Sequence, residues 1–255
     1  TTTGKVGVLI VGREGVGKSS LGNLLCERKC FPVGTVLSSG NKDCSCYTVT
    51  RDNLAYLVVD TPGVCEWETG TQETKETTMK VYHELVMGGM FTAPGPHVIL
   101  VVFKCGRFLR AEYEYYLALK KLFGAEMCTH MIVVFTGVDS LNTPDKPAPD
   151  LASQRAALEE ELGDAPRDSL RIVLDDAGNR YIGVNNNARG AERDTQSREL
   201  IELIKSLYED NEHSHYISDF FQEIFVKIDN ETERRMEQNA CQPRKILRMC
   251  DCVCF

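Results

Sequence analysis

A glycine-rich turn between two apolar segments is the feature that most restricts how this 255-residue chain can fold. Residues 8–25 read VLIVGREGVGKSSLGNLL, so an apolar run meets the turn and leucines at helical spacing follow it. An apolar run bounded by glycine is typical of a buried strand, and spaced leucines are typical of an amphipathic helix. The stretch therefore predicts a strand, a tight loop and a helix in direct succession, which is the repeating unit of α/β proteins.

Strand-like and helix-like segments continue to alternate along the chain. Continuous apolar runs at 97–103 and 130–136 are typical of strands that helices cover on both faces. Residues 44–50 and 54–60 indicate two further strands, and the short turn RDN between them favours an antiparallel pair. We therefore predict an α/β fold whose central sheet is mostly parallel with one antiparallel strand, flanked by helices. The other predicted elements are strands at 5–11 and 181–184 and helices at 18–27, around 115–123 and around 200–207.

The glycine-rich turn also fits the phosphate-binding motif G-x-x-x-x-G-K-[ST], in the strand-to-helix context that this motif requires. In such a loop, backbone N–H groups surround the phosphate oxygens and the lysine reaches the β- and γ-phosphates. The hydroxyl group that follows the lysine can ligate Mg²⁺. The predicted nucleotide contacts in this loop are Gly12, Arg13, Glu14, Gly15, Val16, Gly17, Lys18, Ser19 and Ser20.

The sequence DTPG follows the strand predicted at 54–60. A carboxylate at the end of that strand can hold the hydration shell of Mg²⁺, so Ser19 and Asp60 are the predicted metal residues. Gly63 can offer its backbone N–H to a γ-phosphate and serve as the hinge of a mobile segment. The D-x-x-G pattern is weak by itself, but its position two strands after a phosphate loop makes it specific.

A second carboxylate ends the strand predicted at 130–136, in the sequence TGVD. Asp139 can accept paired hydrogen bonds from the N1–H and the exocyclic amine of guanine, and adenine has no such pair of donors. A buried acceptor discriminates strongly against a base that leaves it unpaired. Asparagines follow the strand at 181–184, where an amide or a backbone N–H can meet the guanine O6, although a plain polar turn is the alternative. Thr136, Asp139, Asn185 and Asn186 are the predicted base contacts.

These motifs occur in the order found in guanine-nucleotide-binding domains, and a further stretch narrows the family. GPHVILVVFKCGRF at 95–108 resembles the characteristic box of AIG-type G domains. These domains define the GTPases of immunity-associated proteins (GIMAP or IAN) and their plant relatives. VVFTGVD and GNRYIGVNNNA resemble the fourth and fifth motifs of the same family. The resemblance implies an AIG-type G domain with the P-loop GTPase fold at 5–210, followed by a helical extension and a cysteine-rich tail at 211–255.

The resemblance also implies an activity. Members of the family bind GTP and GDP with Mg²⁺ and associate with themselves through the nucleotide face, as homodimers or oligomers. Some members hydrolyse GTP poorly, and roles in immunity are typical. Two functions therefore stay open: a slow GTP hydrolase, or a GTP-gated scaffold whose output is oligomerisation. A P-loop ATPase or kinase is a third class, and the guanine motif argues against it.

Two positions depart from the family pattern. Asn41 stands where the switch loop usually has a threonine, and we keep it among the predicted nucleotide contacts because its amide can donate to a phosphate oxygen. Val64 stands where Ras-like enzymes have a glutamine that orients the attacking water. Hydrolysis then needs another group, and Arg107 and Arg13 are the catalytic candidates. A dimer across the nucleotide face could bring one chain's arginine to the other's γ-phosphate, while a structural or surface-paired role is the alternative for each.

Composition and the end of the chain bear on partners and location. A net charge of −8 without clustered Lys and Arg is a poor match for nucleic acid. The 11 scattered cysteines fit a reducing, cytoplasmic setting better than a secreted disulfide framework.

Residues 252–255, CVCF, fit a prenylation signal, and a lipidated tail would place the protein on the cytosolic face of a membrane. The alternatives are a plain cysteine-bearing tail or a longer natural chain. The apolar helical face at 217–228 predicts either a helix docked on the domain or a partner-binding arm.

Overall fold

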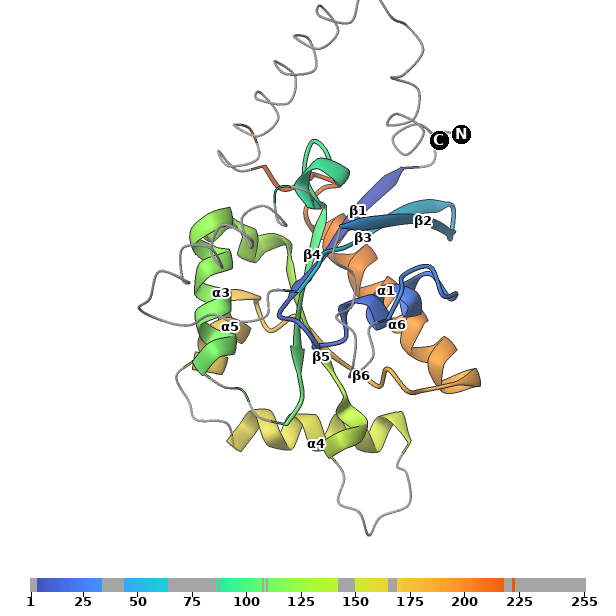
Figure 1. Ribbon diagram of the computed structural model, residues 1–255, viewed down its shortest axis with the longest axis vertical. Coiled ribbons are helices and arrows are strands. Elements are labelled where there is room, and N and C mark those ends of the chain that lie inside the picture. Colours follow the sequence, from blue (N-terminus) through green and yellow to red (C-terminus); the bar gives the residue numbers. More distant parts are fainter. Residues whose placement is uncertain are drawn as a thin grey trace, which may run out of the picture.

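The computed structural model describes residues 4–33, 44–63, 86, 88–106, 108, 110–141, 150–164, 169–217 and 222. One six-stranded sheet crosses the molecule, with its strands in the order β2-β3-β1-β4-β5-β6 (Figure 1). All neighbouring strands are parallel except β2 and β3, which are antiparallel. The predicted fold class is therefore confirmed. The strands are β1 (Lys5–Gly12), β2 (Ser45–Arg51), β3 (Leu54–Asp60), β4 (Val98–Lys104), β5 (Met131–Thr136) and β6 (Tyr181–Val184).

Helices cover both faces of this sheet. In Figure 1, α1 and α6 lie on one side, α3 and α5 lie on the other, and α4 crosses the end toward which the parallel strands point. Successive residues of a strand face opposite ways, so each strand contributes to two apolar cores, one under each helical layer. The helices are α1 (Lys18–Leu25), α3 (Arg110–Phe123), α4 (Leu151–Asp164), α5 (Ser169–Asp176) and α6 (Gly190–Asp210), with 3-10 turns η1 (Ala125–His130) and η2 (Val138–Leu141).

The antiparallel hairpin of β2 and β3 places the end of β3 beside the start of β2. Asp52 and Asn53 form its two-residue turn with φ values of 48° and 63°, a left-handed conformation that suits the right-handed twist of a hairpin. The register pairs Ser45 with Asp60, so the start of β2 lies beside the end of β3. The hairpin therefore brings the start of β2 and the end of β3 to the same end of the sheet, and β3 lies beside β1 there.

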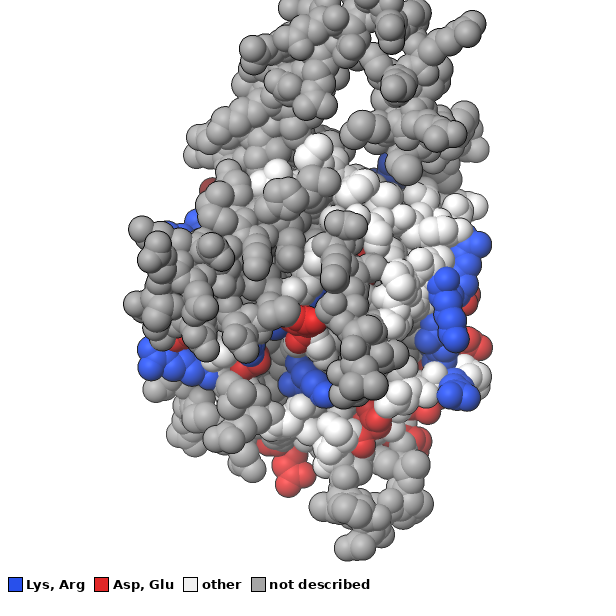
Figure 2. Space-filling model, viewed as in Figure 1, with Lys and Arg blue, Asp and Glu red and all other residues white. Residues whose placement is uncertain are grey.

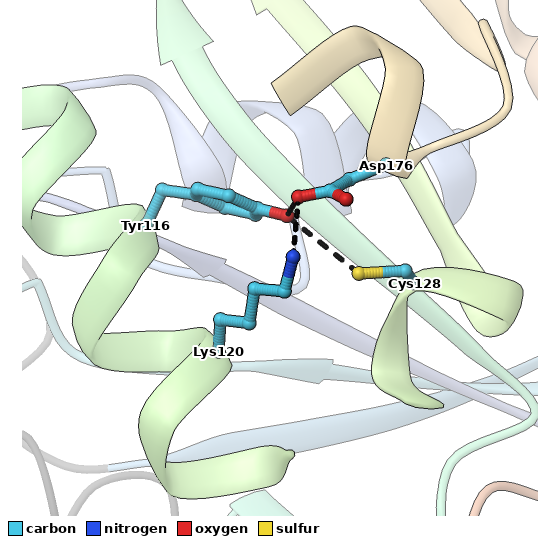
Figure 3. Close-up of polar contacts among 4 residues, drawn as sticks. All are labelled: Tyr116, Lys120, Cys128 and Asp176. Atoms are coloured by element: carbon cyan, nitrogen blue, oxygen red, sulfur yellow. Dashed lines mark hydrogen bonds and ion pairs between the residues drawn. The ribbon is translucent and has the colours of Figure 1, made fainter. Parts of the chain in front are cut away.

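A polar cluster fastens α3 to α5 (Figure 3). The hydroxyl of Tyr116 donates to Asp176 Oδ2 at 2.5 Å, and Lys120 Nζ donates to the same oxygen at 2.7 Å. The Tyr116 hydroxyl also lies 3.6 Å from the thiol of Cys128 in η1. Burial raises the pKa of Tyr116, and its hydrogen bond to Asp176 raises it further, so the phenol stays protonated as a donor. The cluster gives α3 a fixed position over the sheet.

Several histidines lie at the end of the sheet where the parallel strands begin, opposite the end that α4 crosses. His97 Nδ1 accepts a hydrogen bond from the Gly7 N–H at 2.9 Å, and the His130 ring lies 2.9 Å from the carbonyl oxygen of His97. The His215 ring packs edge-on to His97, with centroids 5.9 Å apart. Tyr216 N–H donates to Pro96 O at 2.7 Å, so the segment that follows α6 is fastened to this end.

Parts of the predicted organisation lie outside the described residues. The apolar face at 217–228 is described only at Ile217 and residue 222, and the cysteine-rich tail is not described. The helix α6 ends at Asp210, and the domain boundary expected there stays a prediction. Within the described chain, no helix combines the length and the apolar character needed to cross a membrane.

Candidate nucleotide-binding site

Glycine allows the loop between β1 and α1 to take its shape. Gly15 and Gly17 have φ values of +77° and +93°, in the left-handed region that favours glycine. A Cβ on Gly12 would lie 2.7 Å from Val102 O, so the start of the loop packs directly on β4. The three glycines thus let the backbone bend tightly at the end of β1 and enter α1 at Lys18, the helix end whose first N–H groups have no partner within the helix.

Lys18 joins the two ends of this loop. Its Nζ donates to Gly12 O at 2.9 Å and to Arg13 O at 3.0 Å, and the residue is only 6% exposed. An ammonium group held by two loop carbonyls stays inside the curve of the loop rather than extending into solvent. This is where a phosphate would need a positive charge.

Ser19 and Asp60 form the candidate metal site. Ser19 Oγ donates to Asp60 Oδ2 at 2.6 Å, and Asp60 is fully buried at the end of β3. A hydroxyl and a carboxylate are the hard oxygen ligands that Mg²⁺ prefers, and Mg²⁺ needs few protein ligands because it keeps several waters. The two residues predicted to hold the metal are therefore adjacent, and their chemistry fits that ion.

Gly63 lies against the phosphate loop. A Cβ at this position would come within 2.4 Å of Glu14 Cα and 2.7 Å of Lys18 Nζ. Only a residue without a side chain can approach the loop this closely. The DTPG segment and the phosphate loop are therefore in direct contact, as the sequence motifs predict for two parts of one site.

Two further segments pack on the phosphate loop from the side of β5 and β6. Thr136 is buried and its Oγ1 donates to Val16 O at 2.5 Å. Asn186 Nδ2 donates to Gly17 O at 3.4 Å. The ends of two strands that are far apart in sequence from β1 thus meet the same loop.

Asp139 presents an acceptor with no partner in the described part of the chain. Its Oδ2 accepts a hydrogen bond from Asn187 Nδ2 at 3.0 Å, whereas its Oδ1 is buried and unpaired among the described residues. Asn186 Oδ1 is likewise buried and has no partner among the described residues. Buried acceptors without donors are costly and call for an explanation. A ligand that donates hydrogen bonds would supply one.

The three asparagines after β6 have different roles. Asn185 is engaged within the protein, since its N–H donates to Gln196 Oε1 at 2.7 Å and its Oδ1 accepts from the Asn187 N–H at 2.8 Å. It shapes the loop. Asn187, which is absent from the predicted contacts, is the residue that holds Asp139. The sequence signal that could have identified Asn187 was its place in the NNN run. That run does not show which of the three asparagines contacts Asp139.

Arg13 forms an ion pair on the outer side of the loop. Its Nη1 lies 2.7 Å from Glu112 Oε1 of α3, and the two side chains are 22% and 13% exposed. The surface-paired alternative for Arg13 thus matches its position in this structure. Arg107, Asn41 and Val64 lie outside the described residues, so the roles assigned to them stay predictions.

Charge on the molecular surface is mixed. On the face drawn in Figure 2, basic side chains form separate groups with acidic ones beside them. A continuous basic stripe, the usual footprint of a nucleic-acid-binding protein, is not seen among the described residues of this face.

Two curated plant proteins are similar in sequence to most of this chain. Immune-associated nucleotide-binding protein 9 of Arabidopsis thaliana is 29% identical over 219 residues, which cover 85% of this chain and 59% of that protein. Protein 8 of the same series is 29% identical over 234 residues, covering 91% of this chain and 61% of that protein. The chain therefore spans less than two thirds of the length of these curated relatives.

Solved structures share the fold. Toc33 from Arabidopsis thaliana in complex with GDP and Mg²⁺ matches with a TM-score of 0.57 at 17% identity, over 80% of this chain and 84% of that one. Era in complex with MgGDPNP and a segment of 16S ribosomal RNA matches with a TM-score of 0.50 at 18% identity, over 79% of this chain and 57% of that one. The fold is that of the P-loop GTPases. A family model described as the AIG1 family matches residues 6–239, and the chain therefore belongs to the AIG1 family.

Proposed function

We propose that this protein binds GTP and GDP together with Mg²⁺, hydrolyses GTP slowly and associates with itself according to the nucleotide bound. The observation that carries the proposal is the buried Oδ1 of Asp139, which has no partner among the described residues. Asp139 lies in η2, directly after the strand whose Thr136 packs on the phosphate loop. This arrangement joins a phosphate-binding loop to an acceptor of the kind that guanine satisfies.

The phosphates would lie in the curve of the loop. The N–H groups between Gly12 and Lys18 would donate to phosphate oxygens, and the Lys18 ammonium would offset their charge. Ser19 and Asp60 would hold Mg²⁺, which when bound neutralises charge on the β- and γ-phosphates. Gly63 N–H, beside the loop, is the donor that would recognise the γ-phosphate.

The base would be selected by Asp139. Its unpaired oxygen would accept one guanine N–H donor, and Oδ2 would accept the second while Asn187 holds the carboxylate in place. An adenine ring would leave the buried acceptors unpaired, which costs enough binding energy to favour guanine strongly.

Slow hydrolysis follows from the residues available to the reaction. Val64 cannot orient a water molecule, and Arg13 is held by Glu112 in the ion pair described above. A partner chain would therefore supply the missing group, with Arg107 as its leading candidate, and such an arginine can raise the rate about 10³–10⁵-fold. Dimerization is important for the GTPase activity of the chloroplast translocon components atToc33 and psToc159, which supports the proposal by analogy.

A GTP-gated scaffold is the second candidate, favoured by the same departure at Val64. Single-turnover GTP hydrolysis over a hundredfold range of protein concentration separates the two. Turnover per molecule that rises with concentration supports a dimeric hydrolase, and GTP that stays intact throughout supports the scaffold.

Nucleotide binding itself is tested by competition. GTP and GDP should displace a fluorescent GDP analogue, ATP should not, and Lys18→Ala should abolish binding. Equal competition by ATP, or micromolar GTP affinity retained by Lys18→Ala, would contradict the proposed site.

A further inference from the structure

An ion pair ties the phosphate loop to a helix that the nucleotide motifs do not include. Arg13 Nη1 and Glu112 Oε1 are 2.7 Å apart, and both side chains are mostly buried. Arg13 follows β1 directly, whereas Glu112 lies in the first turn of α3, 99 residues later. A charge-assisted hydrogen bond that is shielded from water is stronger than an exposed surface pair, so this contact can hold the loop in place.

The backbone of Arg13 belongs to the phosphate-binding network. Its carbonyl oxygen accepts from Lys18 Nζ at 3.0 Å, beside the bond from Lys18 to Gly12 O at 2.9 Å. The next residue, Glu14, lies against Gly63. A movement of the Arg13 side chain would therefore displace a carbonyl that positions the lysine, in a loop whose glycines give it little stiffness of its own.

The other end of the ion pair is rigid. Farther along α3, Tyr116 and Lys120 both bond Asp176 of α5 (Figure 3). The helix α3 also packs on the sheet through buried side chains such as Leu119. Glu112 is thus presented by a fixed helix. It is the partner that can impose a position on the loop, because the loop is the more deformable side.

We propose that Glu112 is a positioning residue for nucleotide binding: through Arg13 it holds the Gly12 and Arg13 carbonyls, and with them the Lys18 ammonium, in the arrangement that accepts phosphate. Arg13 is then not the arginine that acts on the γ-phosphate. The inference deepens the proposed function and depends on it, since it concerns the same phosphate loop. It adds α3 to the elements that determine nucleotide affinity.

The test is a double-mutant cycle with Glu112→Gln, Arg13→Gln and the double variant. The measurements are affinities for fluorescent GDP and for a non-hydrolysable GTP analogue, together with kcat at saturating GTP. We expect each single variant to lose roughly tenfold in affinity for both nucleotides, because one charge is left without its partner. The double variant should be no weaker than either single one, and the conservative Arg13→Lys should retain most of the affinity.

Glu114→Gln is the matched control. Glu114 lies on the same helix and pairs with Arg110 at 2.7 Å, but that pair does not reach the phosphate loop, so the variant should bind nucleotide as the wild type does. Unchanged affinity in Glu112→Gln, or additive effects in the double variant, would overturn the inference. So would a large loss of kcat in Arg13→Gln with unchanged affinity, which would make Arg13 catalytic. If the wild type binds no GTP, it is the proposed function that fails.

Discussion

At the scale of single residues, short motifs were enough to nominate the candidate site. The patterns assign proposed roles to Lys18, Ser19 and Asp60, and in the structure Lys18 bonds the phosphate loop and Ser19 bonds Asp60. The contacts of Arg13 with Glu112 and of Asp139 with Asn187 could not be predicted in this way. They join residues 99 and 48 positions apart, and no local pattern specifies which distant side chain will meet a given charge.

Asp139→Asn should change which base the protein selects. Asparagine presents an amide donor where guanine needs an acceptor, so GTP affinity should fall roughly a hundredfold. Xanthosine triphosphate, which carries an oxygen in place of the guanine amine, should gain affinity in the same variant. Competition of both nucleotides against a fluorescent GDP analogue measures the change in base preference. Asp175→Asn, an exposed site paired with Arg171, is the control. Unaltered preference for GTP would contradict the role of Asp139.

At the scale of the element, apolar runs determined what could be predicted. All six strands were predicted because each is a continuous apolar or alternating segment. The helices α4 and α5 were not. Among the described side chains α4 buries few apolar ones, with Leu158 as its main anchor. The helix α5 has eight residues, as α1 does, but no motif like the phosphate loop marks where it begins. The predicted end of α1 at 27 was two residues too late. Asn23 bonds the backbone of Cys30 and Phe31, and this draws the chain away from the helix.

Tyr116→Phe should loosen the attachment of α3 to α5. The substitution removes one hydrogen bond to Asp176 and leaves the aromatic ring in place, so the free energy of unfolding should fall by about 1 kcal/mol. Urea denaturation measures the change. Tyr113→Phe, one turn earlier on α3, provides the comparison and should be close to neutral. Equal stability of the two variants would show that the Tyr116 hydroxyl does not hold the helices together.

At the scale of the whole molecule, the two ends of the sheet carry different groups of side chains. The candidate nucleotide site lies where the parallel strands end, and the histidines lie where they begin, beside the segment that follows α6. Burial, together with the nearby His215, His130 and His213, lowers the pKa of His97 to about 4. Burial also lowers the pKa of His130. Folding therefore favours the neutral rings at this end.

Stability should consequently depend on pH below neutrality. The unfolded chain binds a proton at His97 near its ordinary pKa of 6.5, whereas the folded chain binds it only near 4. The stabilisation is fully present above about pH 6.5 and is lost as pH falls toward 4, by on the order of 2 kcal/mol between pH 7.5 and pH 5. Urea midpoints at the two pH values measure it. His97→Asn, which keeps an acceptor for the Gly7 N–H, should show a smaller dependence, and an equal dependence would assign the effect elsewhere.

The β2–β3 hairpin offers a position at which a label can be attached. Its open end lies at the candidate site, because Ser45 pairs with Asp60, while its two-residue turn at Asp52 and Asn53 lies at the far end of both strands. Residues inserted at the turn would leave the pairing register unchanged, whereas residues inserted within either strand would shift it. The turn is therefore the place to attach a dye or an affinity tag, so that a signal can be followed without altering the site that produces it.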